Sequence, residues 1–277
     1  MFEQREKGKV PILMYHSISP ASTATMQFRP FTVSPACFAE HMAYLVAQHY
    51  TPITVTQLVA SRFSGADPLP QKPVVLTFDD GFADFYASAL PILKQYSFVA
   101  TLFVTTAFVN ATSRWLQKEG ETARPMLTWE QLSELPTHGI ECGAHSHSHA
   151  QLDILPCAMA KAEIEQSKKS LEDHLGRAIT SFAYPFGYQT ARIRQLVQAA
   201  GYTAACAVKH GMSTAQDDPF ALRRLMVKAD TNSVAFATLL TGAYLSPLAA
   251  ATTMYARTRT PLWHLVRRCC ALMKRYR

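Results

Sequence analysis

Short apolar segments alternate with longer amphipathic segments along most of this chain. The apolar segments are rich in aliphatic and aromatic residues, a composition that is typical of strands buried on both faces. We predict strands at 11–15, 52–55, 73–78, 99–104, 139–144, 180–184 and 202–208. Between them apolar residues recur at helical spacing, which predicts helices at 35–49, 84–96, 129–136, 157–174 and 190–200.

Repeated strand–helix units predict a parallel sheet with crossover helices. We therefore expect an α/β fold, a distorted (β/α) barrel of the TIM-like type with about seven parallel strands. At 277 residues the chain is long enough for one domain with a sizeable core and a short appendage. We place the domain at residues 9–245 and the appendage, a basic amphipathic C-terminal helix, at 246–277.

Two adjacent carboxylates, Asp79 and Asp80, directly follow the predicted strand 73–78. Successive strand residues point to opposite faces, so a strained turn is needed to bring both carboxylates into one site. Gly81 gives the backbone the freedom for such a turn. One carboxylate would then bind a metal ion while the other accepts a proton. The alternative is a solvated turn in which Asp80 caps the helix that follows.

Three histidines lie close together after the predicted strand 139–144. His145 and His149 are four residues apart, so one helical turn would place both on the same side. Two neutral imidazoles, a carboxylate and an open position make a catalytic divalent-metal site, with zinc the common occupant. His147 should point elsewhere, as a neighbour of the ligands or a surface residue. An incidental polar loop is the alternative.

These motifs share one geometric property. His16, Asp79, Asp80, His145 and Pro185 all fall at the carboxyl ends of predicted strands. Active residues of such barrels gather at that end. The sequence therefore predicts a single site there.

The segment Thr77-Phe78-Asp79-Asp80-Gly81, followed by His145-Ser146 and His149, resembles the metal motifs of the polysaccharide deacetylase family. This family is also called the NodB homology domain or carbohydrate esterase family 4. Further segments resemble the branch that trims poly-N-acetylglucosamine exopolysaccharides, namely 10–16, 91–93, 100–104 and 127–132. The resemblance extends from about residue 9 to about residue 240. It implies a metal-dependent hydrolase that removes an N-acetyl group from an amino sugar.

The resemblance also implies roles for individual residues. Asp80, His145 and His149 would hold the divalent metal, and Asp79 would deprotonate the attacking water. The segment 182–187 is similar to a third family motif, whose residue after proline donates its backbone N–H to the oxyanion. That role falls on Phe186. A buried strand exit shaped by proline is the alternative for this segment.

Two departures from the family pattern concern an arginine and a histidine. Many members carry an arginine two residues before the proline, where it orients the catalytic aspartate, but this chain has Ala183. Arg224 would replace it from a short strand near the site, or would belong to a surface arginine pair. The C-terminal histidine that serves many members as the acid has no equivalent here. In the exopolysaccharide branch the acid lies after the first strand, which corresponds to His16, although a structural role for His16 is the alternative.

The sequence indicates the substrate-binding residues less clearly than the metal ligands. Tyr184, Pro185 and Trp129 are our candidates for binding the sugar. Trp115, Phe186 and Tyr188 are further aromatic residues that would stack on a sugar ring, or would belong to the core. The loop 17–33 joins the first strand to its helix and would cover the cleft. Polymer and lipid-linked saccharide remain equally open as substrates.

The net charge of +7 is concentrated at the C-terminus. No aspartate or glutamate follows Thr231, and the basic residues beyond it are Arg257, Arg259, Arg267, Arg268, Lys274, Arg275 and Arg277. They equal the whole excess, so we expect no nucleic-acid-binding face on the domain. Apolar residues at helical spacing in 261–277 predict either peripheral binding to an anionic membrane or a helix packed on the barrel.

The remaining composition bears on the cellular compartment. The first residues are charged and show no secretory signal. The six cysteines have no paired-ligand spacing and indicate reduced thiols. We therefore expect a cytoplasmic protein, at the inner face of the membrane if the C-terminal segment binds there.

Three functions are consistent with the sequence. The first is an N-deacetylase acting on an amino-sugar residue of an acetylated glycan or a lipid-linked saccharide. The second is another hydrolase on this fold, acting on an O-acetyl ester, a formamide or a ureide-type C–N bond. The third, a catalytically silent glycan-binding module, is disfavoured because the base and all three ligands are present.

Overall fold

Seven parallel strands close a ring at the centre of the molecule. The computed structural model describes residues 8–65 and 67–242. Neighbouring strands follow the order β1-β10-β9-β8-β7-β6-β5, and β5 pairs back to β1. Their bounds are Ile12–Tyr15 (β1), Pro73–Phe78 (β5), Ala100–Val104 (β6), Ile140–Ala144 (β7), Ser181–Ala183 (β8), Ala204–His210 (β9) and Leu222–Met226 (β10). The predicted distorted barrel of about seven strands is confirmed.

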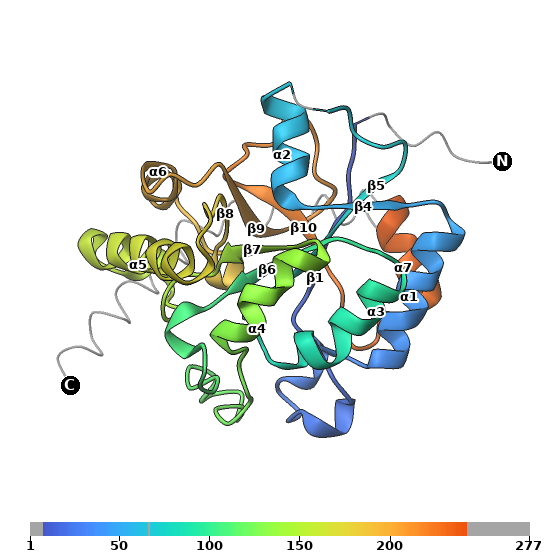
Figure 1. Cartoon of the computed structure of the whole chain (residues 1–277), viewed down its shortest axis with the longest axis horizontal. Coiled ribbons are helices and arrows are strands. Elements are labelled where there is room, and N and C mark those ends of the chain that lie inside the picture. Colours follow the sequence, from blue (N-terminus) through green and yellow to red (C-terminus); the bar gives the residue numbers. More distant parts are fainter. Residues whose placement is uncertain (1–7, 66, 243–277) are drawn as a thin grey trace, which may run out of the picture.

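The helices surround this ring, with α5 and α6 on one side and α1, α3 and α7 on the other (Figure 1). Their bounds are Pro35–Ala47 (α1), Val55–Phe63 (α2), Leu90–Gln95 (α3), Trp129–Glu134 (α4), Cys157–Leu175 (α5), Ala191–Ala199 (α6) and Ser233–Thr241 (α7). Several begin at a serine, threonine or asparagine whose side chain accepts a hydrogen bond from the backbone of the first turn. Such caps satisfy N–H groups that have no partner within the helix.

Two strands differ from the sequence prediction. The predicted strand 52–55 is β4 (Thr51–Ile53), which pairs only with the first half of β5 and lies outside the ring. The seventh place in the ring belongs to β10, which pairs with β1 and β9. Two arginines interrupt the apolar pattern of β10, so hydrophobicity alone did not mark it as a ring strand, although a short strand was expected around Arg224.

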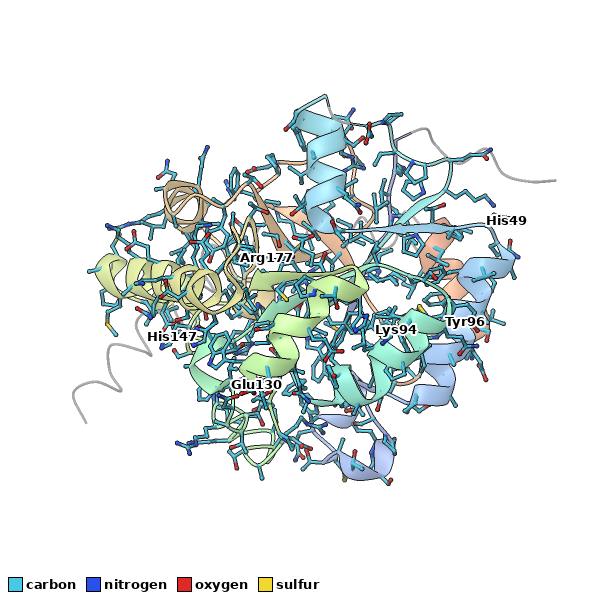
Figure 2. All side chains as sticks on the ribbon, viewed as in Figure 1. His49, Lys94, Tyr96, Glu130, His147 and Arg177 are labelled. Carbon is cyan, nitrogen blue, oxygen red and sulfur yellow. The ribbon has the colours of Figure 1, made fainter. Side chains whose placement is uncertain are left out.

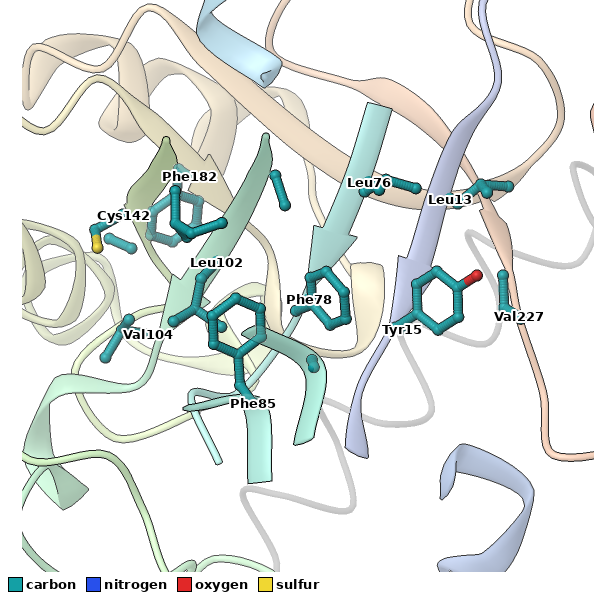
Figure 3. Close-up of a cluster of buried hydrophobic side chains, with 14 of the residues drawn as sticks. Leu13, Tyr15, Leu76, Phe78, Phe85, Leu102, Val104, Cys142, Phe182 and Val227 are labelled. Atoms are coloured by element: carbon teal, nitrogen blue, oxygen red, sulfur yellow. The ribbon is translucent and has the colours of Figure 1, made fainter. Parts of the chain in front are cut away.

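Strand residues alternate between two cores, as a barrel requires. Outward-facing side chains of neighbouring strands, among them Tyr15, Phe78 and Phe182, are fully buried under the helices (Figure 3). Inward-facing side chains such as Ile12, Val75, Phe103, Cys206 and Leu222 fill the ring together with α2. Helix α2 lies at the amino end of the strands, where the N–H of Val55 donates to Thr101 Oγ1 at 3.0 Å. The opposite end is therefore left for the connecting loops.

Two of these loops lie together at the carboxyl end of the strands. The loop after β1 contains β2 (Ser17–Ile18), which pairs with β3 (Thr32–Val33). It contacts the segment 111–127, and both lie below the strands in the view of Figure 1. Phe28 of the first loop packs with Phe82, Leu116 and Met126 in a small apolar cluster. This arrangement places the loop 17–33 at the rim of the predicted site.

The predicted C-terminal amphipathic helix and the boundary at residue 246 lie outside the described residues. The four described cysteines, Cys37, Cys142, Cys157 and Cys206, are free thiols. Among the described helices none is long and apolar enough to cross a membrane.

Candidate active site

The two carboxylates that follow β5 enter the same pocket because the chain turns sharply between them. The N–H of Asp79 donates to the carbonyl of Tyr15 at 3.0 Å, which continues the pairing of β5 with β1. Asp80 and Gly81 then adopt left-handed backbone conformations, with φ of 77° and 85°. Aspartate tolerates this region better than most residues, and glycine adopts it freely. The strained turn expected from the sequence is present, and the alternative of a solvated turn is excluded because both aspartates are buried.

The histidine segment also uses unusual backbone conformations. Residues 145–149 form an irregular bend. The sequence interpretation, which placed His145 and His149 on one turn of a helix, was therefore wrong. Left-handed conformations at Ser146 and His149, with φ of 60° and 58°, bring the two rings together with their centroids 5.0 Å apart. Spacing alone could not reveal this geometry, because it depends on the local turn.

Asp80, His145 and His149 form the only group of three potential metal ligands found among the described residues. Asp80 Oδ1 lies 3.2 Å from His149 Nε2 and 3.5 Å from His145 Nε2. His145 Nδ1 lies 2.8 Å from the carbonyl of Ala183, to which it donates as N–H. This leaves the lone pair of Nε2 for a metal, as is usual for ligating histidines. The donor set therefore fits one divalent cation.

The protonation of this cluster also suits a cation. Burial lowers the pKa of His145 to about 4, and His149 adds to this effect while the two aspartates oppose it. A neutral imidazole at pH 7 is the form that binds a metal. Burial raises the pKa of Asp80, but the hydrogen bond and charge of His149 outweigh it and hold that pKa well below its usual range. The carboxylate is thus ionised near neutral pH.

Arg224 pairs with Asp79 inside the barrel. Its Nη1 and Nη2 lie 2.6 Å and 2.8 Å from the two carboxylate oxygens, and its Nε donates to the carbonyl of Ala207. The Arg224 side chain is fully buried. Burial raises the pKa of Asp79, but the charges of Arg224 and His145 lower it below its usual value. Arg224 therefore binds Asp79 as the family arginine would, in place of the arginine that is missing at position 183. The alternative of a surface arginine is excluded, because its side chain is fully buried.

A pocket of about 290 Å³ opens over the carboxylates and histidines. Both His16 and Phe186 line it, the first at the end of β1 and the second after β8. Phe186 has a left-handed backbone, with φ of 58°, and its ring lies 4.7 Å from that of His149. Gly187 must be glycine, because an added Cβ would lie 2.6 Å from the backbone nitrogen of Val208. The turn therefore holds Phe186 beside the ligands.

The three candidates for sugar binding, Tyr184, Pro185 and Trp129, do not line the pocket. Trp129 lies on α4 and stacks on His174 with ring centroids 3.8 Å apart, away from the pocket lining. Tyr184 is fully buried, and its hydroxyl donates to the carbonyl of Phe220. Neither Tyr184 nor Pro185 is among the residues that line the pocket. The aromatic residues at the pocket are instead Phe28, Phe31, Phe186 and Tyr188.

Two further residues contact the ligand segment, Trp115, which the sequence offered as a sugar-stacking candidate, and Glu163, which had no sequence signal. Trp115 stacks on the ring of His149 at 5.3 Å, so it contacts a ligand and not the pocket. Glu163 on α5 accepts hydrogen bonds from the backbone and hydroxyl of Ser148, at 2.7 Å and 2.6 Å. In the sequence Glu163 is one polar residue on the exposed face of an amphipathic helix. Only the packing of α5 against the turn reveals that it holds the histidine segment.

The side chain of His147 points away from the ligands, as the sequence predicted. Its ring lies 2.9 Å from Thr106 Oγ1 and lines a groove along α5, next to which Figure 2 shows it. Its backbone N–H and carbonyl bind Glu163 and Ala107, respectively. The backbone of His147 therefore holds the turn between the ligands, while its ring lies outside the ligand set.

A family model described as polysaccharide deacetylase matches residues 66–205, which include both carboxylates and all three histidines. This chain belongs to the polysaccharide deacetylase family. The enzyme class expected from the sequence, a deacetylase, is thereby confirmed. Members of this family are metalloenzymes, in agreement with the ligand cluster.

Individual proteins of the family align with between 44% and 87% of this chain. YxkH of Bacillus subtilis, which carries the name of a polysaccharide deacetylase, is 29% identical over 87% of this chain and 77% of its own length. A poly-beta-1,6-N-acetyl-D-glucosamine N-deacetylase of Escherichia coli is 30% identical, but the match covers 44% of this chain and only 19% of that protein. The structure of the Streptococcus pyogenes deacetylase PplD in complex with acetate superposes with a TM-score of 0.71. It is 27% identical over 84% of this chain and 98% of PplD.

Proposed function

We propose that this enzyme removes N-acetyl groups from amino-sugar residues of an acetylated glycan. The observation that carries the proposal is the juxtaposition, in one pocket, of a ligand set for a divalent cation and a buried carboxylate paired with arginine. The similarity to poly-beta-1,6-N-acetyl-D-glucosamine N-deacetylases supports N-acetylglucosamine as the sugar. A polymer and a lipid-linked saccharide both present this group.

Asp80, His145 and His149 would hold the cation, and we propose Zn²⁺ because imidazole and carboxylate ligands suit it. When bound, a divalent cation polarises the amide carbonyl and makes water a better nucleophile at neutral pH. Asp79 would accept the proton of the attacking water, because, despite burial, the charge of Arg224 lowers its pKa and keeps the carboxylate ionised at neutral pH. The backbone N–H of Phe186 would donate to the oxygen of the former carbonyl.

The reaction also needs a proton donor for the leaving amine. Attack of water forms a C–O bond to the acetyl carbon, and collapse breaks the C–N bond to give acetate and a free amine. The amine nitrogen needs a proton as it leaves, and His16, which lines the same pocket, would supply it. Arg224 would act as a positioning residue, because it fixes both oxygens of Asp79.

The proposal is tested with a panel of substrates. A β-1,6-linked N-acetylglucosamine oligosaccharide should release acetate and an equal amount of free amine. O-acetylated, N-formylated and ureide analogues should react far more slowly. If the ester, formamide or ureide reacts best and the acetamide yields no amine, the proposed deacetylation is wrong and another hydrolase activity replaces it.

We further propose that the protein works in the cytoplasm at the inner face of the membrane, on a glycan that has not yet been exported. The support is the sequence alone, since all seven excess positive charges follow residue 256. Each basic residue near an anionic surface contributes about 1 kcal/mol, so seven would hold the protein there reversibly.

We expect the full chain to sediment with anionic liposomes at low salt, and a form that ends at Ala256 to remain in solution. Binding should weaken as salt rises, because the attraction is screened over about a Debye length. Neutral liposomes serve as the control. Equal sedimentation of the two forms, or none by either, would remove the membrane proposal and leave deacetylation untouched.

A further inference from the structure

The pocket over the ligands carries one carboxylate that the proposed chemistry does not use. Of the acidic residues that line it, Asp79 is paired with Arg224 and Asp80 belongs to the metal ligands. The third is Glu119, on the segment 111–127. Its carboxylate makes no ion pair or side-chain hydrogen bond to any residue in 8–65 or 67–242. No lysine or arginine lines the pocket within these ranges.

The nearby Glu121 shows what a structural carboxylate looks like in the same segment. It is buried, accepts the N–H of Thr25 at 2.6 Å and lies 3.1 Å from Nη2 of Arg124. Its charge is therefore compensated inside the fold. Glu119 is half-buried at the pocket wall and lacks such a partner among the described residues. Glu119 thus brings an acidic side chain to the wall of the space that substrate must enter.

The position of Glu119 is fixed by its neighbours. Its carbonyl accepts a hydrogen bond from Thr25 Oγ1 at 2.6 Å, which joins it to the loop after β1. Arg124 Nη1 lies 3.3 Å from Asp84, four residues beyond the ligand Asp80, and its guanidinium lies 4.8 Å from the ring centre of Phe28. The segment is therefore anchored to two other loops. A charge on an anchored backbone can discriminate between ligands, because little ordering is required on binding.

The charge of the substrate changes during the reaction that we propose. Each deacetylation turns a neutral acetamide into a primary amine, which is protonated in neutral water. A chain that has already been deacetylated at one residue therefore presents a cation next to its remaining acetamides. Glu119 has the opposite charge, and it is the one carboxylate of the pocket lining that is neither paired with Arg224 nor among the metal ligands.

We propose that Glu119 is a specificity-determining residue that binds the ammonium group of a deacetylated sugar adjacent to the one being hydrolysed. This inference rests on the proposed deacetylase function. It makes partly deacetylated glycans better substrates than fully acetylated ones, so that the reaction promotes itself along a chain. The attraction is electrostatic, and it weakens as salt rises.

The test compares two β-1,6-linked N-acetylglucosamine oligosaccharides of equal length, one fully acetylated and one with a single free amine beside an acetylated residue. The quantity measured is the ratio of their kcat/KM values for acetate release by the full-length, metal-loaded enzyme. The native enzyme should favour the amine-containing substrate, mainly through KM. Glu119→Gln should lower this ratio by about five-fold, since a partly exposed ion pair is worth up to about that factor.

Two variants keep the result interpretable. Asp173→Asn makes the same change of charge on the exposed surface of α5 and should leave the ratio at its native value. Glu119→Lys should invert the preference, because it places a like charge near the amine. A ratio in Glu119→Gln equal to that of the native enzyme at low salt would overturn the inference. If the native enzyme releases acetate from neither oligosaccharide, the proposed function itself fails, which is a separate outcome.

Discussion

Replacing His149 with alanine is expected to abolish both metal retention and turnover. His149 Nε2 lies 3.2 Å from Asp80 Oδ1, and its removal leaves two ligands where a catalytic site needs three. The measurement is metal content after gel filtration, together with acetate release from the oligosaccharide substrate. Circular dichroism of the variant shows whether the barrel has folded.

The chain offers a matched control for this change. His147→Ala removes a histidine two residues away whose ring binds Thr106 and lies outside the ligand set. This variant should keep one divalent ion per chain. Full metal occupancy in His149→Ala, or loss of the ion in His147→Ala with the fold intact, would contradict the assignment of ligands.

The second large effect is expected from Asp79→Asn, which should slow turnover by about two to four orders of magnitude while the metal is retained. Loss of a general base has this reach, and asparagine keeps the size of the side chain while it removes the charge that accepts the proton. The rate is measured under saturating substrate, and metal content is measured on the same sample. If the metal is lost and excess metal restores the rate, Asp79 is a ligand and its proposed role is wrong.

Stability must be separated from catalysis in this variant, because Arg224 would be left buried without its counter-ion. An unpaired buried charge costs about 3–5 kcal/mol in the free energy of unfolding. The double variant Asp79→Asn, Arg224→Gln leaves no ion unpaired, so part of the stability should return. The rate should stay low. Recovery of the rate with stability would assign the loss in Asp79→Asn to folding and not to chemistry.

The sequence predicted the parts of this protein that depend on local pattern. Apolar strands located the barrel, and the residues after them located the site, since parallel strands deliver their carboxyl ends to one edge. Asp79 and Asp80 could be placed together by a single argument about strand geometry. The resemblance to a family pointed to His16 and Phe186, which both line the pocket, and it supplied the roles that we propose for them.

What the sequence could not predict depends on contacts between distant segments. Trp129 resembles a sugar-binding tryptophan as much as a packing residue, and only the partner ring of His174 distinguishes the two. Glu119 and Glu121 have the same side chain two positions apart, yet Glu121 is paired with Arg124 while Glu119 lines the pocket. The turn at Ser146 and His149 is set by backbone conformations that both residue types adopt infrequently.

The pairing of Asp79 with Arg224 has a consequence for how activity arises during synthesis. The two residues are 145 positions apart, and Arg224 belongs to the last strand of the ring. A nascent chain that has emerged only as far as β9 already contains the aspartates, the histidines and Phe186, but it lacks Arg224. In the complete barrel Arg224 binds both carboxylate oxygens of Asp79 and, despite burial, lowers its pKa. We therefore expect hydrolytic competence to appear only when β10 docks beside β1, so that enzyme activity would report barrel closure in refolding experiments.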